Sequence, residues 1–271
     1  MHAKPGAVNK SPLSFFILVF ILSIPFWILG AMAPDTTKLL PVQLPISALM
    51  TFCPLIAAAI LVYKKQKIQG VKHLLQLSFD FKKIKNKKWY LVILFLMPAI
   101  SLLSFLYMKL SVGILPGPKI STLFVVIFLI LYFIGAIGEE IGWSGYVTPL
   151  LQNRYGALKA SLLLGTIWAL WHIIPWSQAH QTTIWIIWQC IGTVFLRVIM
   201  VWIFNNTGKS VFAMVCFHTM VNISPYLIPN YGSHYNPFAF SVLAIVTATI
   251  AYFFYFKRHS PGISKADVFD K

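Results

Sequence analysis

Long, unbroken apolar runs dominate this 271-residue chain. Hydrophobic residues make up 58% of the sequence and charged residues only 10%, whereas a soluble domain carries roughly a quarter charged residues. Such a chain cannot cover a water-facing surface, so we expect an integral membrane protein. Because lipid offers the backbone no hydrogen bonds, spanning segments must be helices or closed barrels. The continuous rather than alternating apolar pattern favours helices.

Each apolar run is near the ~20 residues that a helix needs to cross a bilayer. The sequence predicts about eight transmembrane helices, at about 13–33, 43–63, 89–111, 121–150, 158–176, 182–204, 209–229 and 236–257. The fourth run is too long for one straight span and contains four glycines, so we expect a kink or a turn onto the membrane surface there. No internal repeat or long linker is visible. We therefore expect a single all-α, membrane-embedded domain over residues 1–271.

The net charge of +16 comes from basic residues that lie mainly between the apolar runs. Nine lysines fall between Lys64 and Lys88, which is typical of a positive-inside loop that contacts anionic lipid headgroups. No aromatic interleaving or folded basic domain accompanies them, so nucleic-acid binding is not expected. Placing these lysines inside predicts that both termini are cytoplasmic, and we expect the cell (plasma) membrane as the location. The first run, from Leu13 to Ala33, reaches spanning length and is interpreted as a retained helix.

The three cysteines do not suggest a disulfide framework or a metal knuckle. Cys53, Cys190 and Cys216 all lie in apolar runs and lack paired spacing. Such cysteines are typically small core residues.

Few ionisable side chains lie inside the apolar runs. Of only six acidic residues, Glu139 and Glu140 sit side by side in one run, and His172, Arg197 and His218 lie in others. Charged groups at membrane depth are energetically expensive and often functional. We therefore expect a polar site buried inside the helix bundle.

The depth of these groups agrees with a shared site. Counted back from the cytoplasmic ends at ~1.5 Å per residue, Glu139 lies roughly 16 Å deep, His172 about 21 Å and His218 about 13 Å. Residues four apart on a helix share a face, which pairs Trp168 with His172, His218 with Asn222, Glu139 with Trp143 and Glu140 with Ser144. A carboxylate beside a neutral imidazole can deprotonate water or hold a metal that does so.

Asn222 and His218 could donate hydrogen bonds to a developing oxyanion. Together with the carboxylate and the imidazole, this composition suits hydrolysis of a peptide bond in or near the membrane. The expected partner is a peptide or membrane-protein substrate.

Three sequence blocks carry a resemblance to a known family. They are Gly138-Glu139-Glu140-Ile141-Gly142-Trp143 with Gly145-Tyr146, then Trp168-Ala169-Leu170-Trp171-His172 with Pro175, then His218-Thr219-Met220-Val221-Asn222. The blocks cover a core of about 120–225. In order and helix placement they resemble the CPBP family, the intramembrane proteases related to the type II CAAX prenyl endopeptidase and often described as Abi or bacteriocin-processing proteins.

The resemblance implies proteolysis near the cytoplasmic side of the bilayer. On the family pattern, Glu139 and His172 form the general base. His218 and Asn222 stabilise the oxyanion, and Glu140 is a supporting second carboxylate.

The metal requirement stays open at this point. The family is often labelled as metalloproteases, yet its groups also suit a metal-free glutamate mechanism. The sequence has no His-Glu-x-x-His motif and no Cys/His cluster. If a metal such as zinc is bound, Glu139, His172 and His218 are the expected ligands.

The chain departs from the family pattern at Ser144, where the family usually has an arginine four residues after the second glutamate. An arginine there would pair with Glu140 and keep it ionised. Without it, either Glu140 is protonated or another cation takes its place. Arg197 is the candidate for that cation, and the alternative is that Arg197 snorkels toward the cytoplasmic interface.

Other functions also fit parts of the sequence. Gly142-Trp143-Ser144-Gly145 matches the Gly-x-Ser-Gly signature of rhomboid serine proteases, although Thr219 and Met220 after His218 do not continue that pattern. A membrane aspartyl protease is excluded because no Asp lies in an expected span. A proton-coupled transporter could use Glu139, Glu140 and Arg197 as a relay, but it would predict repeats of the spans. A non-catalytic immunity or scaffold protein could keep the polar cluster as structure.

Overall fold

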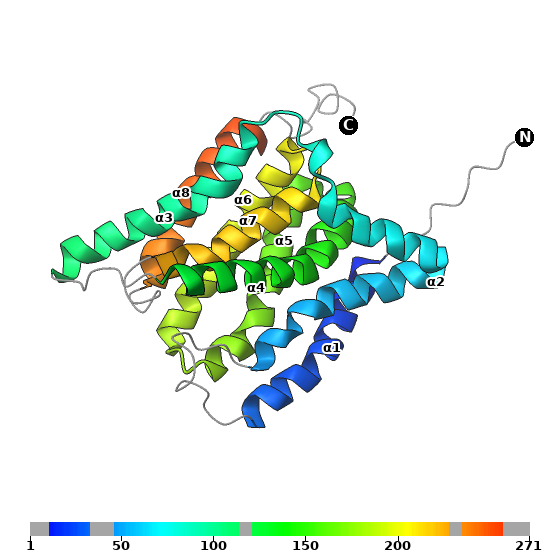
Figure 1. Cartoon of the computed structure of the whole chain (residues 1–271), viewed down its shortest axis with the longest axis horizontal. Helices are drawn as coiled ribbons and strands as arrows, with labels where there is room; N and C mark the ends of the chain where they lie inside the picture. Colours follow the sequence, from blue (N-terminus) through cyan, green and yellow to red (C-terminus); the bar gives the residue numbers. More distant parts are fainter. Residues whose placement is uncertain (1–10, 33–45, 114–120, 228–234, 257–271) are drawn as a thin grey trace, which may run out of the picture.

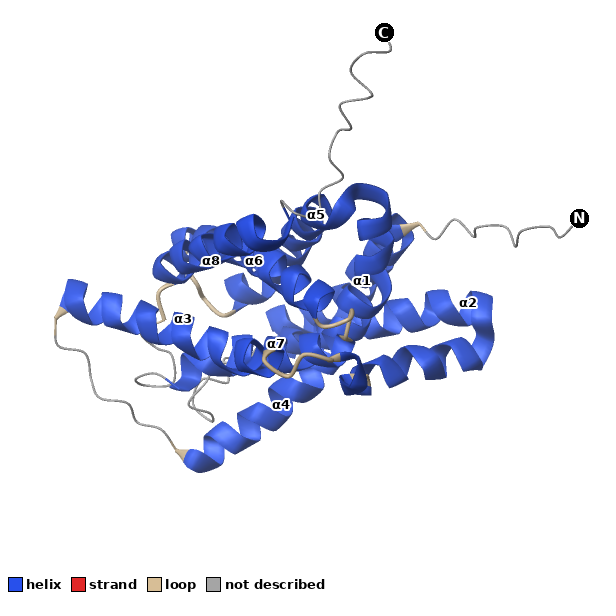
Figure 2. Ribbon diagram, turned by 90° about the horizontal axis from the view of Figure 1, so that it is seen from above, coloured by secondary structure: helices blue, strands red, loops and turns tan. Residues whose placement is uncertain are grey.

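The structure is a computed structural model that describes residues 11–32, 46–113, 121–227 and 235–256. Every regular element in these ranges is helical (Figure 2). The α-helices are α1 (Pro12–Met32), α2 (Cys53–Gln76), α3 (Trp89–Val112), α4 (Thr122–Glu140), α5 (Thr148–Gln178), α6 (Thr183–Asn206), α7 (Val211–Ile223) and α8 (Pro237–Ala251). The predicted all-α fold is therefore confirmed. The organisation as one domain over residues 1–271 stays a prediction.

Six helical stretches of the described chain are long and apolar enough to cross a membrane. They are 12–32, 46–79, 89–111, 122–178, 183–206 and 237–254. The stretch 122–178 contains both α4 and α5, and α7 lies in a shorter apolar helix, Val211–Leu227. The chain is thus a polytopic integral membrane protein. The expected fourth and fifth spans both lie in the stretch 122–178, and the helix is broken between them at Gly156.

The helices form one bundle with α4, α5, α6 and α7 at its centre (Figure 1). α4 packs on α7, and α5 packs on α6, which also packs on α8. α1 and α2 cover one side of this group, and α3 and α8 lie at the opposite side (Figure 1). The four central helices are those that carry the ionisable residues singled out in the sequence.

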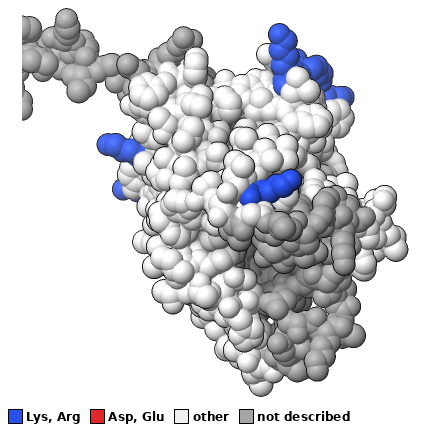
Figure 3. Space-filling model, turned by 90° about the vertical axis from the view of Figure 1, so that its left-hand side faces the viewer, with Lys and Arg blue, Asp and Glu red and all other residues white. Residues whose placement is uncertain are grey.

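The surface of the bundle agrees with a lipid environment. The face in Figure 3 shows a few Lys and Arg side chains, no acidic side chain among its described residues, and otherwise uncharged groups. Large apolar side chains such as Leu91, Phe95 and Leu110 of α3 are exposed. A face of this kind is stable only when lipid replaces water around it.

The lysine-rich segment after the second span is helical, so the prediction of a loop there is wrong for most of its length. α2 continues to Gln76, and its only break is at Lys67, whose φ of 52° reverses the chain. The two arms lie side by side (Figure 1). A Cβ on Gly70 would come within 2.8 Å of Val62, so glycine permits this close approach. Lys and Gln are good helix formers, which explains why a charged connection folds into helix.

The junction between α4 and α5 contains the irregularity that its glycines predict. A π-helical segment, η4 (Ile141–Val147), follows directly after Glu140. A Cβ on Gly142 would collide with the backbone carbonyl of Pro54, so glycine lets the start of α2 pack directly on η4. A second break lies inside α5 at Gly156, with φ 74°. π-Helical turns often occur at functional sites, and this one begins directly after the paired glutamates.

α7 begins at a carboxylate from the polar connection between α2 and α3. Asp80 accepts hydrogen bonds from Ser210 Oγ at 2.7 Å and from the backbone N–H groups of Val211 and Phe212 at 3.2 and 3.0 Å. A carboxylate at a helix N-terminus satisfies free N–H groups and complements the helix dipole. This contact fixes the start of the helix that carries His218.

Candidate active site

Four helices bring the ionisable residues of the membrane segments together. Glu139 and Glu140 are the last two residues of α4, His172 lies in α5, Arg197 in α6 and His218 in α7. Glu140, Arg197, His218 and Glu139 are 0, 1, 2 and 6% exposed, and His172 is half-buried. Burial of so many ionisable groups requires that they satisfy one another.

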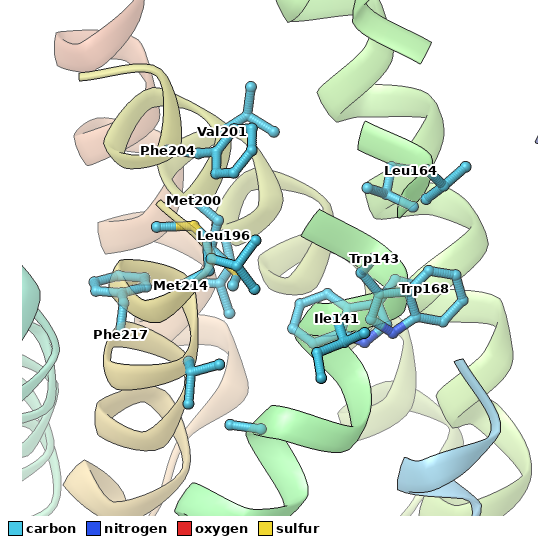
Figure 4. Close-up of a cluster of buried hydrophobic side chains, with 14 of the residues drawn as sticks. Ile141, Trp143, Leu164, Trp168, Leu196, Met200, Val201, Phe204, Met214 and Phe217 are labelled. Atoms are coloured by element: carbon cyan, nitrogen blue, oxygen red, sulfur yellow. The ribbon is translucent and has the colours of Figure 1, made fainter. Parts of the chain in front are cut away.

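Glu139 is held by neutral donors. Its Oε2 accepts hydrogen bonds from Trp168 Nε1 at 2.8 Å and from Trp143 Nε1 at 3.3 Å, and Figure 4 shows the two indole nitrogens next to each other. Its Oε1 lies 3.1 Å from Thr51 Oγ1. A carboxylate offers about four acceptor positions, so Oε1 has room for one more donor. No cation pairs with Glu139 within the described ranges.

Glu140 has the opposite environment, because a cation occupies both of its oxygens. Arg197 Nη1 lies 3.3 Å from Oε1 and 3.1 Å from Oε2, and Nη2 lies 3.3 Å from Oε1. His218 Nδ1 is 2.9 Å from Oε1, and Ser144 Oγ donates to Oε2. Arg197 is therefore the cation that replaces the family arginine. The alternative that Arg197 snorkels to the interface is wrong, since its side chain is 1% exposed.

Trp168 lies at the centre of the cluster. Its indole N–H donates to Glu139, and its ring meets the rings of His172 and His218 edge-on, with both centroid distances at 5.3 Å. The Arg197 guanidinium carbon lies 4.0 Å from the ring centroid, a cation–π geometry. Trp168 therefore contacts ionisable side chains that α4, α6 and α7 contribute to the site, and also His172 of its own helix. The sequence predicts only its proximity to His172.

The two histidines present different ring nitrogens to the site. His172 Nδ1 lies 2.8 Å from the carbonyl oxygen of Trp168. A carbonyl only accepts, so Nδ1 carries the proton and the neutral ring keeps a lone pair on Nε2. His218 Nδ1 donates to Glu140 in the same way, so His218 can donate from Nε2 only as an imidazolium. Trp176 stacks on His172, with ring centroids 5.3 Å apart.

Asn222 is half-buried in α7, one turn after His218. Its side chain has no hydrogen-bond partner among the residues that the structure describes. Its predicted contact with an oxyanion stays a prediction.

Thr51 is the site residue that sequence reasoning misses. It lies in the short helix η1 (Ile46–Phe52), and its hydroxyl is 3.0 Å from the carbonyl oxygen of Gly135 as well as 3.1 Å from Glu139 Oε1. One hydroxyl proton is shared between these two acceptors. The only signal in the sequence is a threonine inside an apolar run, which is too common to single out.

The residues expected to hold a metal do not form a ligand set. Among the described residues, no group of three His, Cys, Asp or Glu side chains is arranged to hold a metal ion. Glu139, His172 and His218 therefore do not fit a metal in this arrangement.

The serine protease interpretation has no support in the geometry. Ser144 is 3% exposed, and its hydroxyl donates to Glu140. His218 also bonds Glu140, and no hydrogen bond joins Ser144 to His218 in the described part of the chain. A nucleophilic serine needs a base within hydrogen-bond reach.

Two adjacent glutamates, two histidines and an arginine thus meet inside a bundle of membrane helices, as expected of an integral membrane protein with a polar site. Comparison with known proteins gives the family. The family model described as "Type II CAAX prenyl endopeptidase Rce1-like" matches residues 121–224. The chain is 30% identical over 238 residues to CAAX prenyl protease 2 of Methanococcus maripaludis. The aligned residues cover 82% of this chain and 87% of that protein. The chain therefore belongs to the Rce1-like family of type II CAAX prenyl endopeptidases, a protease family, and the predicted resemblance is confirmed.

Proposed function

We propose that this protein is an intramembrane endopeptidase that cleaves prenylated CAAX-type peptides with a water molecule activated between Glu139 and His172. The substrate class follows the name of its archaeal relative. The observation that carries the mechanism is the contrast between two adjacent carboxylates. One of them is neutralised by a cation and the other is not.

Glu139 has the features that a general base needs. Its hydrogen-bond donors are neutral, so its negative charge is not offset by an ion pair, and Oε1 keeps one acceptor position. His172 keeps a lone pair on Nε2. A water molecule that donates one proton to each of these acceptors would have its oxygen oriented for attack on a carbonyl carbon.

Glu140 suits a supporting role. Both of its oxygens are occupied by Arg197, His218 and Ser144, so it has little capacity to accept a proton from water. Its carboxylate accepts a hydrogen bond from Nδ1 of His218 and fixes the orientation of that ring. Oxyanion stabilisation requires His218 to donate from Nε2 as well, which a ring with a proton on both nitrogens does.

In the proposed reaction, the water oxygen bonds to the peptide carbonyl carbon while one water proton passes to Glu139 or His172. The carbonyl oxygen gains negative charge and accepts hydrogen bonds from His218 and Asn222. The C–N bond then breaks, and the transferred proton goes to the leaving amine. Water is the only co-reactant, so atoms and charges balance.

We also propose that the site opens toward the cytoplasmic half of the plasma membrane, with both termini cytoplasmic and the lysine-rich segment against anionic headgroups. The excess of Lys and Arg on one side of the predicted topology supports this orientation. Family membership favours proteolysis over a proton-coupled transporter and over a non-catalytic scaffold or immunity protein.

His172→Ala tests the proposed function directly. Purified wild-type protein in detergent should cleave a farnesylated CAAX peptide, as measured by mass spectrometry of the products, and should cleave the unprenylated peptide more slowly. His172→Ala removes one acceptor for the water, and loss of general-base assistance lowers rates by about 10²–10⁴-fold. His73→Ala is the matched control, because His73 is exposed on α2 far from these contacts.

Cleavage of neither peptide by the wild-type protein, or full activity in folded His172→Ala, would contradict the proposal. Equal rates on the two peptides would instead exclude prenyl recognition and leave a general intramembrane peptidase. Size-exclusion chromatography of each variant establishes that the protein compared is folded.

A further inference from the structure

Arg197 makes two buried contacts at the same time. The edge of its guanidinium bonds both oxygens of Glu140, with nitrogen–oxygen distances of 3.1–3.3 Å. Its flat face covers the ring of Trp168, with the guanidinium carbon 4.0 Å from the ring centroid. Arginine is suited to such a double role because its planar group forms bidentate ion pairs and stacks on aromatic faces.

The ring that stacks under Arg197 is also the closest hydrogen-bond donor to Glu139. Trp168 Nε1 lies 2.8 Å from Glu139 Oε2, whereas Trp143 Nε1 lies 3.3 Å from the same oxygen. A cation over the face of an indole draws electron density toward itself and makes the ring N–H a better donor. Stacking also fixes the plane of the ring and therefore the direction of its N–H bond.

The contacts form a continuous path through the site. It runs from Glu139 to Trp168, then to Arg197, Glu140 and His218. Within this path Arg197 joins the half assigned to water activation to the half assigned to the oxyanion, beside the direct edge-on contact of the Trp168 and His218 rings. It also offsets the charge of Glu140, which lies next to Glu139 in the chain.

The packing of α5 on α6 brings Arg197 to this place. A Cβ on Gly165, one turn before Trp168, would come within 2.8 Å of the carbonyl oxygen of Val194 and 3.1 Å of Arg197 Cβ. The absence of a side chain at Gly165 therefore permits the two helices to approach closely. This approach places the guanidinium over the indole of the neighbouring helix.

We propose that Arg197 is a positioning residue for the hydrolysis: through Trp168 it fixes the Glu139 carboxylate, and through Glu140 it fixes His218. The proposal rests on the proposed function, because it assigns a role in that reaction. Arg197 does not touch the substrate or the water in this assignment. Its effect is on the geometry and hydrogen-bonding strength of the two groups that do.

Arg197→Lys is the test variant, because lysine keeps a positive charge beside Glu140 but has no planar group to stack on Trp168. In the cleavage assay, kcat should fall by up to about a hundredfold, since small misplacements of catalytic groups have effects of this size. KM should stay unchanged. Arg154→Lys is the matched control, because Arg154 is exposed and stacks only on Tyr155.

Trp168→Phe supplies a second measurement, which separates a positioning role of Arg197 from a purely structural one. Phenylalanine keeps an aromatic face for Arg197 but removes the N–H that bonds Glu139. Arg197→Lys should therefore lower kcat less in the Trp168→Phe background than in the native one, because the branch through Trp168 is already interrupted while the branch through Glu140 remains. Thermal unfolding and the folded fraction are measured for all four proteins, so that kcat refers to folded protein.

The outcomes separate this proposal from the proposed function. If the wild-type protein cleaves the peptide and Glu139→Gln does not, but Arg197→Lys keeps the full kcat, only the role of Arg197 is overturned. An equal loss from Arg197→Lys in both backgrounds would also overturn it, since Arg197 would then act independently of Trp168. If Glu139→Gln cleaves as fast as wild type, the proposed function itself fails.

Discussion

At the scale of single residues, the structure separates two neighbouring glutamates that the sequence presents as a pair. Contacts within one helix could be predicted from spacing: Trp143 bonds Glu139, and Ser144 bonds Glu140, each four residues away. Contacts between helices could not, because they depend on helix packing that a single sequence does not encode locally. Thr51 on Glu139 and the stacking of Arg197 on Trp168 are of this second kind.

Ser144→Ala distinguishes the glutamate mechanism from a serine mechanism. The substitution removes one hydrogen bond to Glu140, and the free energy of unfolding should fall by about 1 kcal/mol. Arg197 and His218 still hold Glu140, so we expect cleavage to continue at a rate close to wild type. Thermal unfolding and the peptide assay measure the two effects. A folded Ser144→Ala protein without activity, beside a Glu139→Gln protein that still cleaves, would favour Ser144 as the nucleophile.

At the scale of secondary structure, hydropathy predicts where helices lie but not how each one is interrupted. The helical runs agree with the expected spans, yet the return arm of α2 is absent from that prediction, because its lysines resemble a polar connection. The irregularity after Glu140 was predicted from glycines, whereas its π-helical form and its contact with Pro54 required the structure. These breaks position the ends of α4 and α5 around the site.

Gly142→Ala tests whether η4 positions the paired glutamates. The added methyl group would collide with the carbonyl of Pro54, so η4 must shift and carry Glu139 and Glu140 with it. We expect kcat to fall by up to about a hundredfold in the peptide assay. Gly145→Ala is the matched control in the same segment, because its nearest contact, Leu77, lies at an ordinary 3.4 Å. Equal activity in the two variants would contradict a positioning role for η4.

At the scale of the whole molecule, composition alone indicates the class of protein, since 58% hydrophobic and 10% charged residues exclude a water-soluble fold. The three motif blocks add the family, which the match over residues 121–224 and the archaeal relative establish. Orientation in the membrane depends on the distribution of lysines between the two sides. That distribution is a property of the complete chain and not of any one helix.

The orientation can be measured with single cysteines in a background whose three native cysteines are replaced. A cysteine at Lys72, in the lysine-rich arm of α2, should react with a membrane-impermeant maleimide only in inside-out vesicles, because the positive-inside rule places it in the cytoplasm. A cysteine at Lys38, which follows the first apolar run and lies outside the described residues, should react only in right-side-out cells, because a cytoplasmic amino terminus places that connection on the outer side. The reverse pattern would contradict the proposed topology.

The most direct measurement of the central claim, that Glu139 and not Glu140 activates water, is the cleavage rate of folded Glu139→Gln beside folded Glu140→Gln. Glu139→Gln removes the base without breaking an ion pair, so the protein should stay folded and bind the peptide while cleavage falls to background. Glu140→Gln leaves Arg197 buried without its anion, which costs roughly 3–5 kcal/mol of stability, so its main defect should be thermal unfolding at lower temperature. A folded Glu139→Gln protein that cleaves at the wild-type rate, with Glu140→Gln folded and inactive, would show that the roles of the two glutamates are reversed.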